Sequence, residues 1–122
     1  QMLCKKSEEG VLPGLGWIDA EVKKFNFPEG TNLKVPHMGW NQVHVKKENP
    51  LIKNPEEEHR FYFVHSYHVV CKNEADILGT TNYGIEFTSS VSHDNIYGAQ
   101  FHPEKSHRFG MELLKNFIDI PC

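Results

Sequence analysis

Gln100-Phe101-His102-Pro103-Glu104-Lys105-Ser106 connects residues 95–101 to the C-terminal helix predicted for this chain. Pro103 has a fixed φ and disfavours a helical backbone at His102, so we expect His102 to be extended. Residues two apart in an extended segment project from the same face. The imidazole of His102 and the carboxylate of Glu104 should therefore lie side by side, with Glu104 orienting the ring or stabilising its charge.

Two interpretations of this pair are open. A histidine held by a carboxylate is two-thirds of a nucleophile–base–orienter triad. Alternatively, the two residues are a surface histidine and glutamate beside a strand-to-helix turn, and spacing alone favours this interpretation. A catalytic role requires a nucleophile as well.

The three cysteines are poor candidates for that nucleophile. Cys4 lies on the same predicted helical turn as Met2 and Leu3, which suits packing. Cys71 closes an apolar strand and is expected to be buried and inert, and Cys122 is terminal. None follows the pattern of a glycine-flanked strand-to-helix elbow, which exposes a nucleophile beside its own N–H groups. We therefore expect this chain to be inactive alone.

Composition limits the class of protein. The 122 residues carry 13 Lys and Arg against 16 Asp and Glu, a net charge of −3, which fits a single domain or part of a larger one. The sequence has no clustered basic face for nucleic acid and no apolar run long enough to span a membrane. Three cysteines without paired spacing and no secretory signal predict a cytoplasmic location.

Eight histidines invite a metal interpretation, but their spacing opposes it. His65 and His68 are three apart on a predicted strand and should point to opposite faces. No His-Glu-x-x-His, Cys-x-x-Cys or glycine-rich phosphate loop occurs. We expect no metal and no cofactor.

Hydrophobic periodicity predicts a mostly β chain that ends in one helix. Residues 61–70 are apolar in both parities, as in a strand covered on both sides. Residues 17–27 form an edge or half-exposed strand, and Tyr83-Gly84 is a turn between two strands. The remaining expected segments are a turn at 28–32, strands at 42–45, 77–82 and 86–91, a polar loop at 46–58 with a possible helical turn, and an amphipathic helix through Phe109, Leu113, Leu114, Phe117 and Ile118, capped by Ser106.

Two further segments are irregular. Pro36 and Gly39 should interrupt any regular strand, yet Met38 and Trp40 lie between and beside them. Such apolar residues are either folded back onto the core or offered to a partner. Residues 1–6 look like the middle of a helix that ends near its lysines, so we expect the chain to be truncated upstream.

Four segments in this order carry a family resemblance. They are Val35-Pro36-His37-Met38-Gly39-Trp40-Asn41, Phe61-Tyr62-Phe63-Val64-His65-Ser66-Tyr67, Gly79-Thr80-Thr81 with Tyr83, and Phe101-His102-Pro103-Glu104-Lys105-Ser106. The chain closely resembles the second half of triad-type (class I) glutamine amidotransferases, especially the glutaminase subunits of imidazole glycerol phosphate synthase. The resemblance implies an α/β fold, an open mixed sheet with flanking helices. Residues 1–122 would be the C-terminal portion of a single amidotransferase domain, truncated at its N-terminus.

The resemblance also implies roles for individual residues. In that family a Gly-x-Cys-x-Gly-x-Gln elbow supplies the cysteine, and Gln1-Met2-Leu3 looks like its close, which places the cysteine upstream of Gln1. His102 would be the general base and acid, and Glu104 would orient it. Gln1, Ser66 and Tyr67 would hold the substrate glutamine.

The implied function is hydrolysis of glutamine to glutamate and ammonia, with the ammonia passed to a (β/α)8-barrel cyclase in histidine biosynthesis. The residues expected at or near that partner are Pro36, Met38, Trp40, Asn41, Tyr62 and Lys105.

Some features depart from that branch. Gly16-Trp17-Ile18-Asp19-Ala20-Glu21 and residues 46–60 look more like a paralogous branch that supplies ammonia for amidation of surface-polysaccharide sugars. The resemblance favours histidine biosynthesis over sugar amidation. Two more hypotheses stay open, namely a non-catalytic binding module that kept the fold and a hydrolase with serine in the upstream position.

Overall fold

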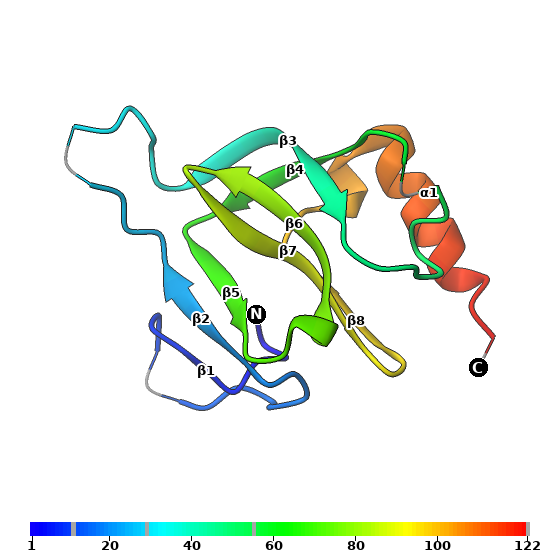
Figure 1. Cartoon of the computed structure of the whole chain (residues 1–122), viewed down its shortest axis with the longest axis horizontal. Coiled ribbons are helices and arrows are strands. Elements are labelled where there is room, and N and C mark those ends of the chain that lie inside the picture. The colour runs from blue at the N-terminus through cyan, green and yellow to red at the C-terminus, as the bar shows by residue number, and fades with distance from the viewer. Residues whose placement is uncertain (11, 29, 55, 122) are drawn as a thin grey trace.

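The computed structural model describes residues 1–10, 12–28, 30–54 and 56–121, which form a β-sheet and a C-terminal helix (Figure 1). The strands are β1 Lys6–Ser7, β2 Ala20–Lys24, β3 His37–Val45, β4 His59–His65, β5 Tyr67–Cys71, β6 Ile77–Tyr83, β7 Ile85–His93 and β8 Ile96–Ala99. Two short 3-10 helices, η1 Glu74–Asp76 and η2 Pro103–Lys105, precede β6 and the α-helix α1 His107–Ile118, respectively.

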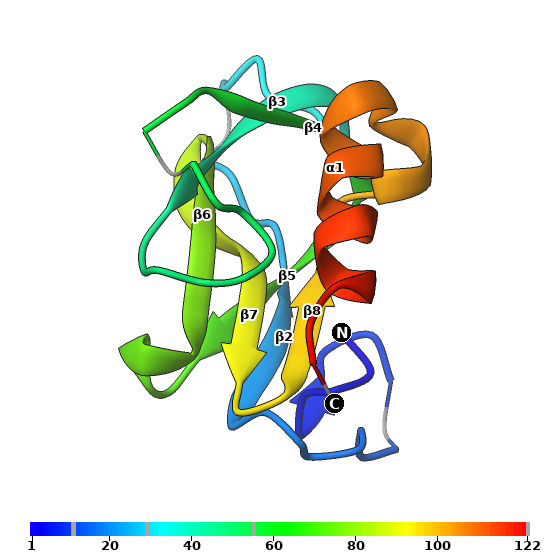
Figure 2. The same ribbon diagram turned by 90° about the vertical axis from the view of Figure 1, so that its right-hand side faces the viewer.

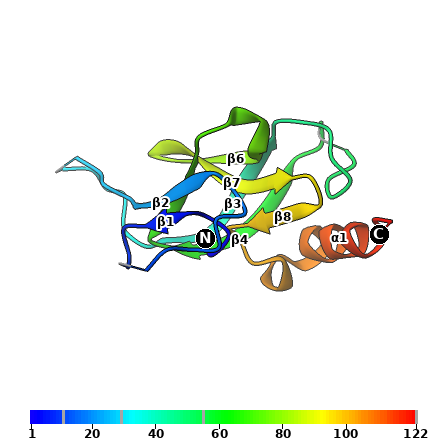
Figure 3. The same cartoon turned by 90° about the horizontal axis from the view of Figure 1, so that it is seen from below.

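The strands form one mixed sheet in the order β1-β2-β5-β7-β6-β3-β4, and β8 pairs with β7 beside β5. The β1–β2 pair is parallel and the other strand pairs are antiparallel. Figures 2 and 3 show α1 lying along one side of this sheet, next to β8. The open mixed sheet flanked by helix is the fold class that the sequence predicts.

The prediction of one long strand at 61–70 is wrong, because the strand is interrupted at Ser66, between β4 and β5. The carbonyl of Ser66 accepts a hydrogen bond from the Phe25 N–H at 3.0 Å, outside any strand ladder. β4 before the break pairs with β3, whereas β5 after it pairs with β2 and β7. Burial alternates along β4, so its run of apolar residues is not covered on both faces.

The irregular loop predicted around Gly39 is also wrong. β3 begins at His37 and pairs residue by residue with β4 as far as Val43. Gly39 has φ +123°, which a glycine adopts without the steric penalty of a side chain, so the strand continues through it. Met38 and Trp40 are 61% and 41% exposed, so they are not folded back onto the core.

Residues 1–6 are not helical either. They form a turn followed by β1, and the Lys5 N–H donates to the Ala20 carbonyl while the Ile18 N–H donates to the Leu3 carbonyl, both at 3.0 Å. A single helical turn is costly to nucleate, whereas these bonds satisfy the backbone against the segment that leads into β2. Cys4 is buried in the same place, as its predicted packing role requires.

Other sequence predictions are confirmed. β6 and β7 form a hairpin whose turn residue Gly84 has φ +76°, and β2 occupies the centre of the strand expected at 17–27. The polar loop at 46–58 is also confirmed, but its described residues lack the helical turn that the sequence allowed there. Leu51 and Ile52 from this loop are nevertheless buried in the main apolar cluster.

The C-terminal helix is confirmed, but its buried face differs from the predicted one. Gly110, Leu113 and Asn116 are buried, whereas Phe117 and Ile118 are 52% and 78% exposed. Asn116 faces inward because its Nδ2 donates to the Leu51 carbonyl at 2.8 Å. A count of apolar positions cannot anticipate that a glycine and an asparagine form the contact.

Candidate active site

His102 and Glu104 meet at the junction between β8 and α1. Nδ1 of His102 lies 2.8 Å from Oε1 of Glu104, so the predicted proximity of the two side chains is confirmed. The predicted backbone is only half right. His102 is extended, with φ −103° and ψ 97°, but Pro103 begins the 3-10 helix η2 instead of continuing an extended segment.

This contact selects the tautomer of the neutral His102 ring. An ionised carboxylate only accepts hydrogen bonds, so Nδ1 of His102 carries the proton that Glu104 accepts. The pKa of Glu104 is lowered by a hydrogen bond from its own backbone N–H and then by that from His102, which keeps the carboxylate ionised. Nε2 of the neutral ring then carries a lone pair, which is the state that a general base requires.

Ser106 fixes the segment that carries this pair. It is fully buried; its hydroxyl donates to the His102 carbonyl at 2.6 Å and accepts from the Tyr62 N–H at 3.0 Å. The His102 N–H in turn donates to the Tyr62 carbonyl at 2.9 Å. Ser106 precedes α1 as predicted, but its side chain makes no cap hydrogen bond to the helix and instead ties η2 to β4.

The predicted substrate-binding residues lie on the same rim of the sheet as the His102 segment. Nε2 of Gln1 donates to the Tyr67 carbonyl at 3.1 Å and to Oε1 of Gln100 at 2.7 Å. Gln100 is two residues before His102, so this bridge joins the start of the chain, the start of β5 and the His102 segment. Ser66 adjoins Tyr67, and its carbonyl is occupied by the Phe25 N–H.

The described cysteines are unsuited to nucleophilic attack. Burial raises the pKa of Cys4, and burial together with the nearby Asp76 raises the pKa of Cys71 to about 11. Because the thiolate is the reactive form, a raised pKa makes a thiol inert. Cys122 lies outside the described residues.

The predicted partner residues separate into two groups. Met38, Trp40 and Tyr62 share the outer face of β3 and β4, where Trp40 packs edge-on to Tyr62 and stacks on His107 with 5.5 Å between ring centroids. Pro36, directly before β3, and Lys105, the last residue of η2, are also exposed. Asn41 lies on the opposite face of β3, with its Nδ2 2.9 Å from the Asn82 carbonyl.

Sequence reasoning missed two side-chain pairs that contain histidine. One is His37 with His65, buried and 2.9 Å apart between Nδ1 and Nε2. His65 and His68 do not point to opposite faces as predicted, because the break at Ser66 places both rings around Phe25, at 5.2 and 4.8 Å between centroids. No sequence signal marks the pair, since its members are 28 residues apart.

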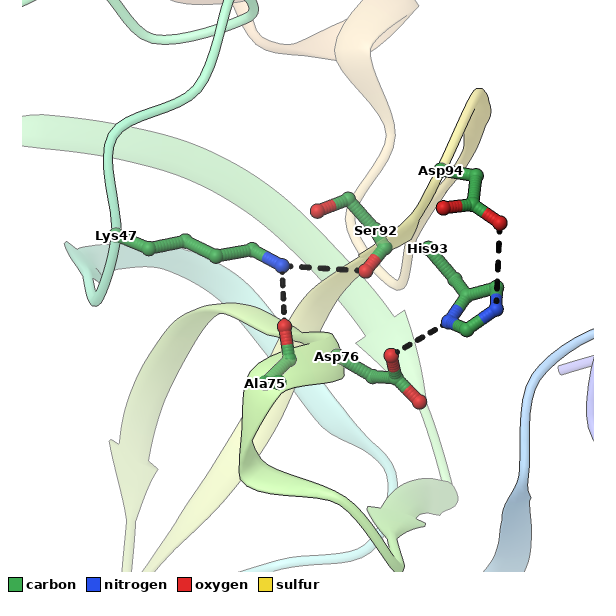
Figure 4. Close-up of polar contacts among 6 residues, drawn as sticks. All are labelled: Lys47, Ala75, Asp76, Ser92, His93 and Asp94. Carbon is green, nitrogen blue, oxygen red and sulfur yellow. Dashed lines mark hydrogen bonds and ion pairs between the residues drawn. The ribbon is translucent and has the colours of Figure 1, made fainter.

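The other missed pair is Asp76 with His93, shown in Figure 4. Nδ1 of His93 lies 2.8 Å from Oδ1 of the buried Asp76, and this hydrogen bond raises the pKa of His93. Lys47 donates from the other side to the carbonyls of Ala75 and Ser92. The pair has the local geometry of His102 and Glu104 but lies at the opposite end of β8, beside the β7–β8 turn.

Among residues 1–10, 12–28, 30–54 and 56–121, no three His, Cys, Asp or Glu side chains converge as metal ligands would. In the same described part of the chain, no helix is long and apolar enough to cross a membrane.

A sequence model described as "Glutamine amidotransferase class-I" matches residues 1–120 of this chain. The chain belongs to the class-I glutamine amidotransferase family. It is 54% identical over 120 residues to "Imidazole glycerol phosphate synthase subunit HisH 2" of Pseudomonas aeruginosa, covering 98% of this chain and 58% of that protein. It is 56% identical over 117 residues to the protein of the same name from Methanococcus maripaludis, covering 96% and 57%. The chain thus spans less than two thirds of these relatives.

A solved structure shares the fold of this amidotransferase chain. A protein of Thermoplasma acidophilum, described as a GMP synthase subunit, superposes with a TM-score of 0.61 at 22% identity. The match covers 82% of this chain and 47% of that protein. It supports the fold and the mixed sheet that positions His102.

Proposed function

We propose that this chain supplies the base, the orienting acid and part of the substrate site of a glutaminase. The enzyme hydrolyses glutamine to glutamate and ammonia. The observation that carries the proposal is the 2.8 Å contact between His102 and Glu104 in a chain of the class-I glutamine amidotransferase family. In this role Glu104 holds the ring so that Nε2 faces the reacting thiol and amide.

The reaction follows from these parts. Nε2 of His102 accepts the proton of a cysteine thiol, and the thiolate attacks the side-chain amide carbon of glutamine. The imidazolium gives its proton to the leaving nitrogen, which departs as ammonia and leaves a glutamyl thioester. Nε2 then accepts a proton from water as the water attacks the thioester. The C–S bond breaks, the imidazolium returns its proton to the cysteine sulfur, and glutamate is released. The Glu104 carboxylate stabilises the imidazolium formed in each step.

We propose that the attacking thiol lies outside this chain, in a Gly-x-Cys-x-Gly-x-Gln elbow that precedes Gln1. Two observations support this. The pKa values of Cys4 and Cys71 are both raised, which opposes thiolate formation. The relatives are also longer, since this chain spans 57% to 59% of their length.

We further propose that the ammonia is delivered to a (β/α)8-barrel cyclase, with histidine biosynthesis as the pathway. The relatives at 54% and 56% identity carry the name of an imidazole glycerol phosphate synthase subunit. The exposed Met38 and Trp40 and the half-buried Tyr62, on the outer face of β3 and β4, are the proposed contact surface for that partner.

The test uses the protein that holds this chain together with the upstream elbow and the cyclase. His102→Ala should reduce the rate of ammonia release from glutamine by about a thousandfold or more, because general acid–base catalysis contributes roughly 10² to 10⁴. Glu104→Gln should reduce the rate less, since the base remains and only its orientation and charge stabilisation are lost. Ammonia release is followed by a coupled assay.

His93→Ala is the matched control, since His93 has the same contact to a carboxylate, at 2.8 Å, but at the other end of β8. Its rate should stay within about twofold of the native rate. Equal and negligible effects of the His102 and Glu104 substitutions would show that the two residues only flank a surface turn. Ammonia release stimulated by a sugar-amidating enzyme instead of the cyclase would reassign the acceptor.

A further inference from the structure

The buried pair formed by His37 and His65 lies where β3 and β4 are directly opposite each other. His37 is 2% exposed and His65 is 7% exposed. Neither residue is part of the proposed chemistry. A buried polar group that loses its partner costs more than an ordinary hydrogen bond contributes, so each ring nitrogen here needs a defined partner.

The hydrogen-bond partners fix both tautomers. Nδ1 of His65 lies 2.7 Å from the Tyr67 carbonyl, which only accepts, so Nδ1 carries the proton. Nε2 of neutral His65 therefore accepts, and its partner at 2.9 Å, Nδ1 of His37, must donate. Nε2 of His37 is then an acceptor as well, and Nδ2 of Asn41 donates to it at 3.2 Å.

Burial keeps both rings neutral. It lowers the pKa of His37 to about 4, with the neighbouring His65 as a second cause. Burial also lowers the pKa of His65; the hydrogen bond to the Tyr67 carbonyl opposes this lowering, and His68 and His102 add smaller lowering contributions. The rings are packed among the aromatic side chains of Phe25, Phe63, Tyr83 and Phe87. Protonation would place two N–H groups against each other in this apolar surrounding.

The chain of bonds runs in one direction, from Asn41 through His37 and His65 to the carbonyl of Tyr67. That carbonyl is also the acceptor of Nε2 of Gln1, at 3.1 Å. The relay therefore ends on two residues, Gln1 and Tyr67, that the family resemblance assigns to glutamine binding. It begins on β3, whose opposite face carries the exposed Trp40.

We propose that His37 and His65 are positioning residues for the glutaminase reaction. They form a buried two-imidazole relay that anchors the Tyr67 carbonyl, and with it the Ser66–Tyr67 segment, to strand β3. The inference rests on the proposed function for its substrate, glutamine. It adds residues that touch neither the substrate nor the reacting atoms but set the geometry of the segment that does.

Two substitutions at His65 separate positioning from packing. The amide nitrogen of asparagine reaches the position of Nδ1, so His65→Asn keeps a donor for the Tyr67 carbonyl. The amide of glutamine reaches the position of Nε2, so His65→Gln keeps the partner of His37 but loses that donor. The KM for glutamine should rise roughly 3- to 10-fold in His65→Gln, the equivalent of one lost hydrogen bond. In His65→Asn it should stay within about twofold, with kcat little changed in both.

The relay also has a spectroscopic signature. Long-range proton–nitrogen NMR spectra of the same protein should show His37 and His65 as neutral Nδ1–H tautomers at neutral pH. His37→Leu removes the donor to Nε2 of His65. The Tyr67 carbonyl should still hold the Nδ1–H tautomer, and the Nε2 signal of His65 should move towards that of a ring nitrogen that accepts no hydrogen bond. His44→Leu, an exposed histidine on the same strand, is the control and should leave the His65 signals unchanged.

The outcomes distinguish this inference from the proposed function. If His102→Ala is inactive but His65→Gln has a native KM, or raises it no more than His65→Asn does, the positioning role is wrong while the glutaminase stands. If the native protein releases no ammonia, the glutaminase is wrong. In that case the tautomers still test the relay: an Nε2–H tautomer at His65 overturns it, and the paired Nδ1–H tautomers support it.

Discussion

At the scale of single residues, burial decides the charge of the histidines in β3 and β4. A ring that is 2% exposed, as in His37, loses the hydration that stabilises its imidazolium. Its pKa falls from 6.5 to about 4, so the folded protein holds it neutral where the unfolded chain would protonate it. The pKa values of His65 and His68 are lowered by burial too, so all three act on stability with the same sign.

This sign predicts acid destabilisation. A lowered folded-state pKa gives stability that is fully present above the unfolded value of 6.5 and is lost as pH falls from there towards about 4. With about 1.4 kcal/mol per pKa unit, His37 contributes on the order of 2 to 3 kcal/mol to this loss. Urea unfolding at about pH 7 and about pH 4 measures how much the free energy of unfolding falls on acidification. This fall should be smaller for His37→Gln than for the native protein.

His93 provides the opposite sign as a control. Asp76 raises the pKa of His93, so its stabilisation is present below 6.5 and lost only as pH rises through the raised folded value. His93→Gln should thus leave the loss between neutral and acid pH undiminished. An acid loss that is the same in native protein and His37→Gln would contradict the buried neutral ring.

At the scale of elements, the contact between η2 and α1 holds the segment that carries His102 and Glu104 against the helix. Gly110 of α1 lies so close to the Pro103 carbonyl that a Cβ would come within 1.7 Å of its oxygen. Glycine is required there by this approach, although it is a poor helix former. Ser106 supplies the second attachment by joining η2 to β4.

Gly110→Ala should therefore destabilise the protein. Helix propensity alone predicts a gain of about 1 kcal/mol, but the overlap with Pro103 should cost about 1 to 3 kcal/mol or more and displace η2. We expect a lower free energy of unfolding in urea and a reduced rate of ammonia release. Gly10→Ala, where a Cβ meets nothing within 4 Å, is the control and should change stability by less than about 0.5 kcal/mol. A stabilised Gly110→Ala variant would show that η2 does not approach the helix.

How far the sequence predicts these elements depends on the range of the interaction that decides them. Local signals sufficed for three features. A turn residue marks the hairpin at Gly84, hydrophobic periodicity marks α1, and a proline between His102 and Glu104 marks their contact. They failed at Ser66, because the break depends on Phe25, some 40 residues earlier, and at Gly39, where pairing with β4 overrides a helix- and strand-breaking residue. The His37–His65 relay is absent from any local pattern because strand register creates it.

At the scale of the whole molecule, the rim of the sheet and the outer face of β3 and β4 meet at η2. The outer face presents Met38, Trp40 and Tyr62 beside His107, while the rim presents His102, Gln1 and Tyr67. Ser106 connects the two, since its hydroxyl contacts the backbone of both Tyr62 and His102. A partner bound at Trp40 would therefore lie next to the proposed glutaminase site.

Trp40→Ala should weaken binding of the cyclase about tenfold to a hundredfold, as expected for a large aromatic residue at an interface. The free energy of unfolding of the subunit should change by less than about 1 kcal/mol, because the ring is 41% exposed. Titration calorimetry measures the affinity. Trp17→Ala, at a tryptophan that is 54% exposed away from β3, is the control and should bind normally.

A large drop in melting temperature of the isolated Trp40→Ala subunit, with unchanged affinity for the cyclase, would identify Trp40 as a packing residue. The stacking on His107 would then serve to hold α1 against β3.

The most direct measurement of the central claim is intact-mass spectrometry of the protein quenched in acid during turnover of glutamine with its cyclase. His102 is proposed to act in both formation and hydrolysis of the glutamyl thioester, with proton transfer to the leaving nitrogen first. The native protein should carry a covalent glutamyl adduct and release ammonia, whereas His102→Ala should show neither within the same time. An adduct that forms and turns over at the native rate in His102→Ala would contradict the account.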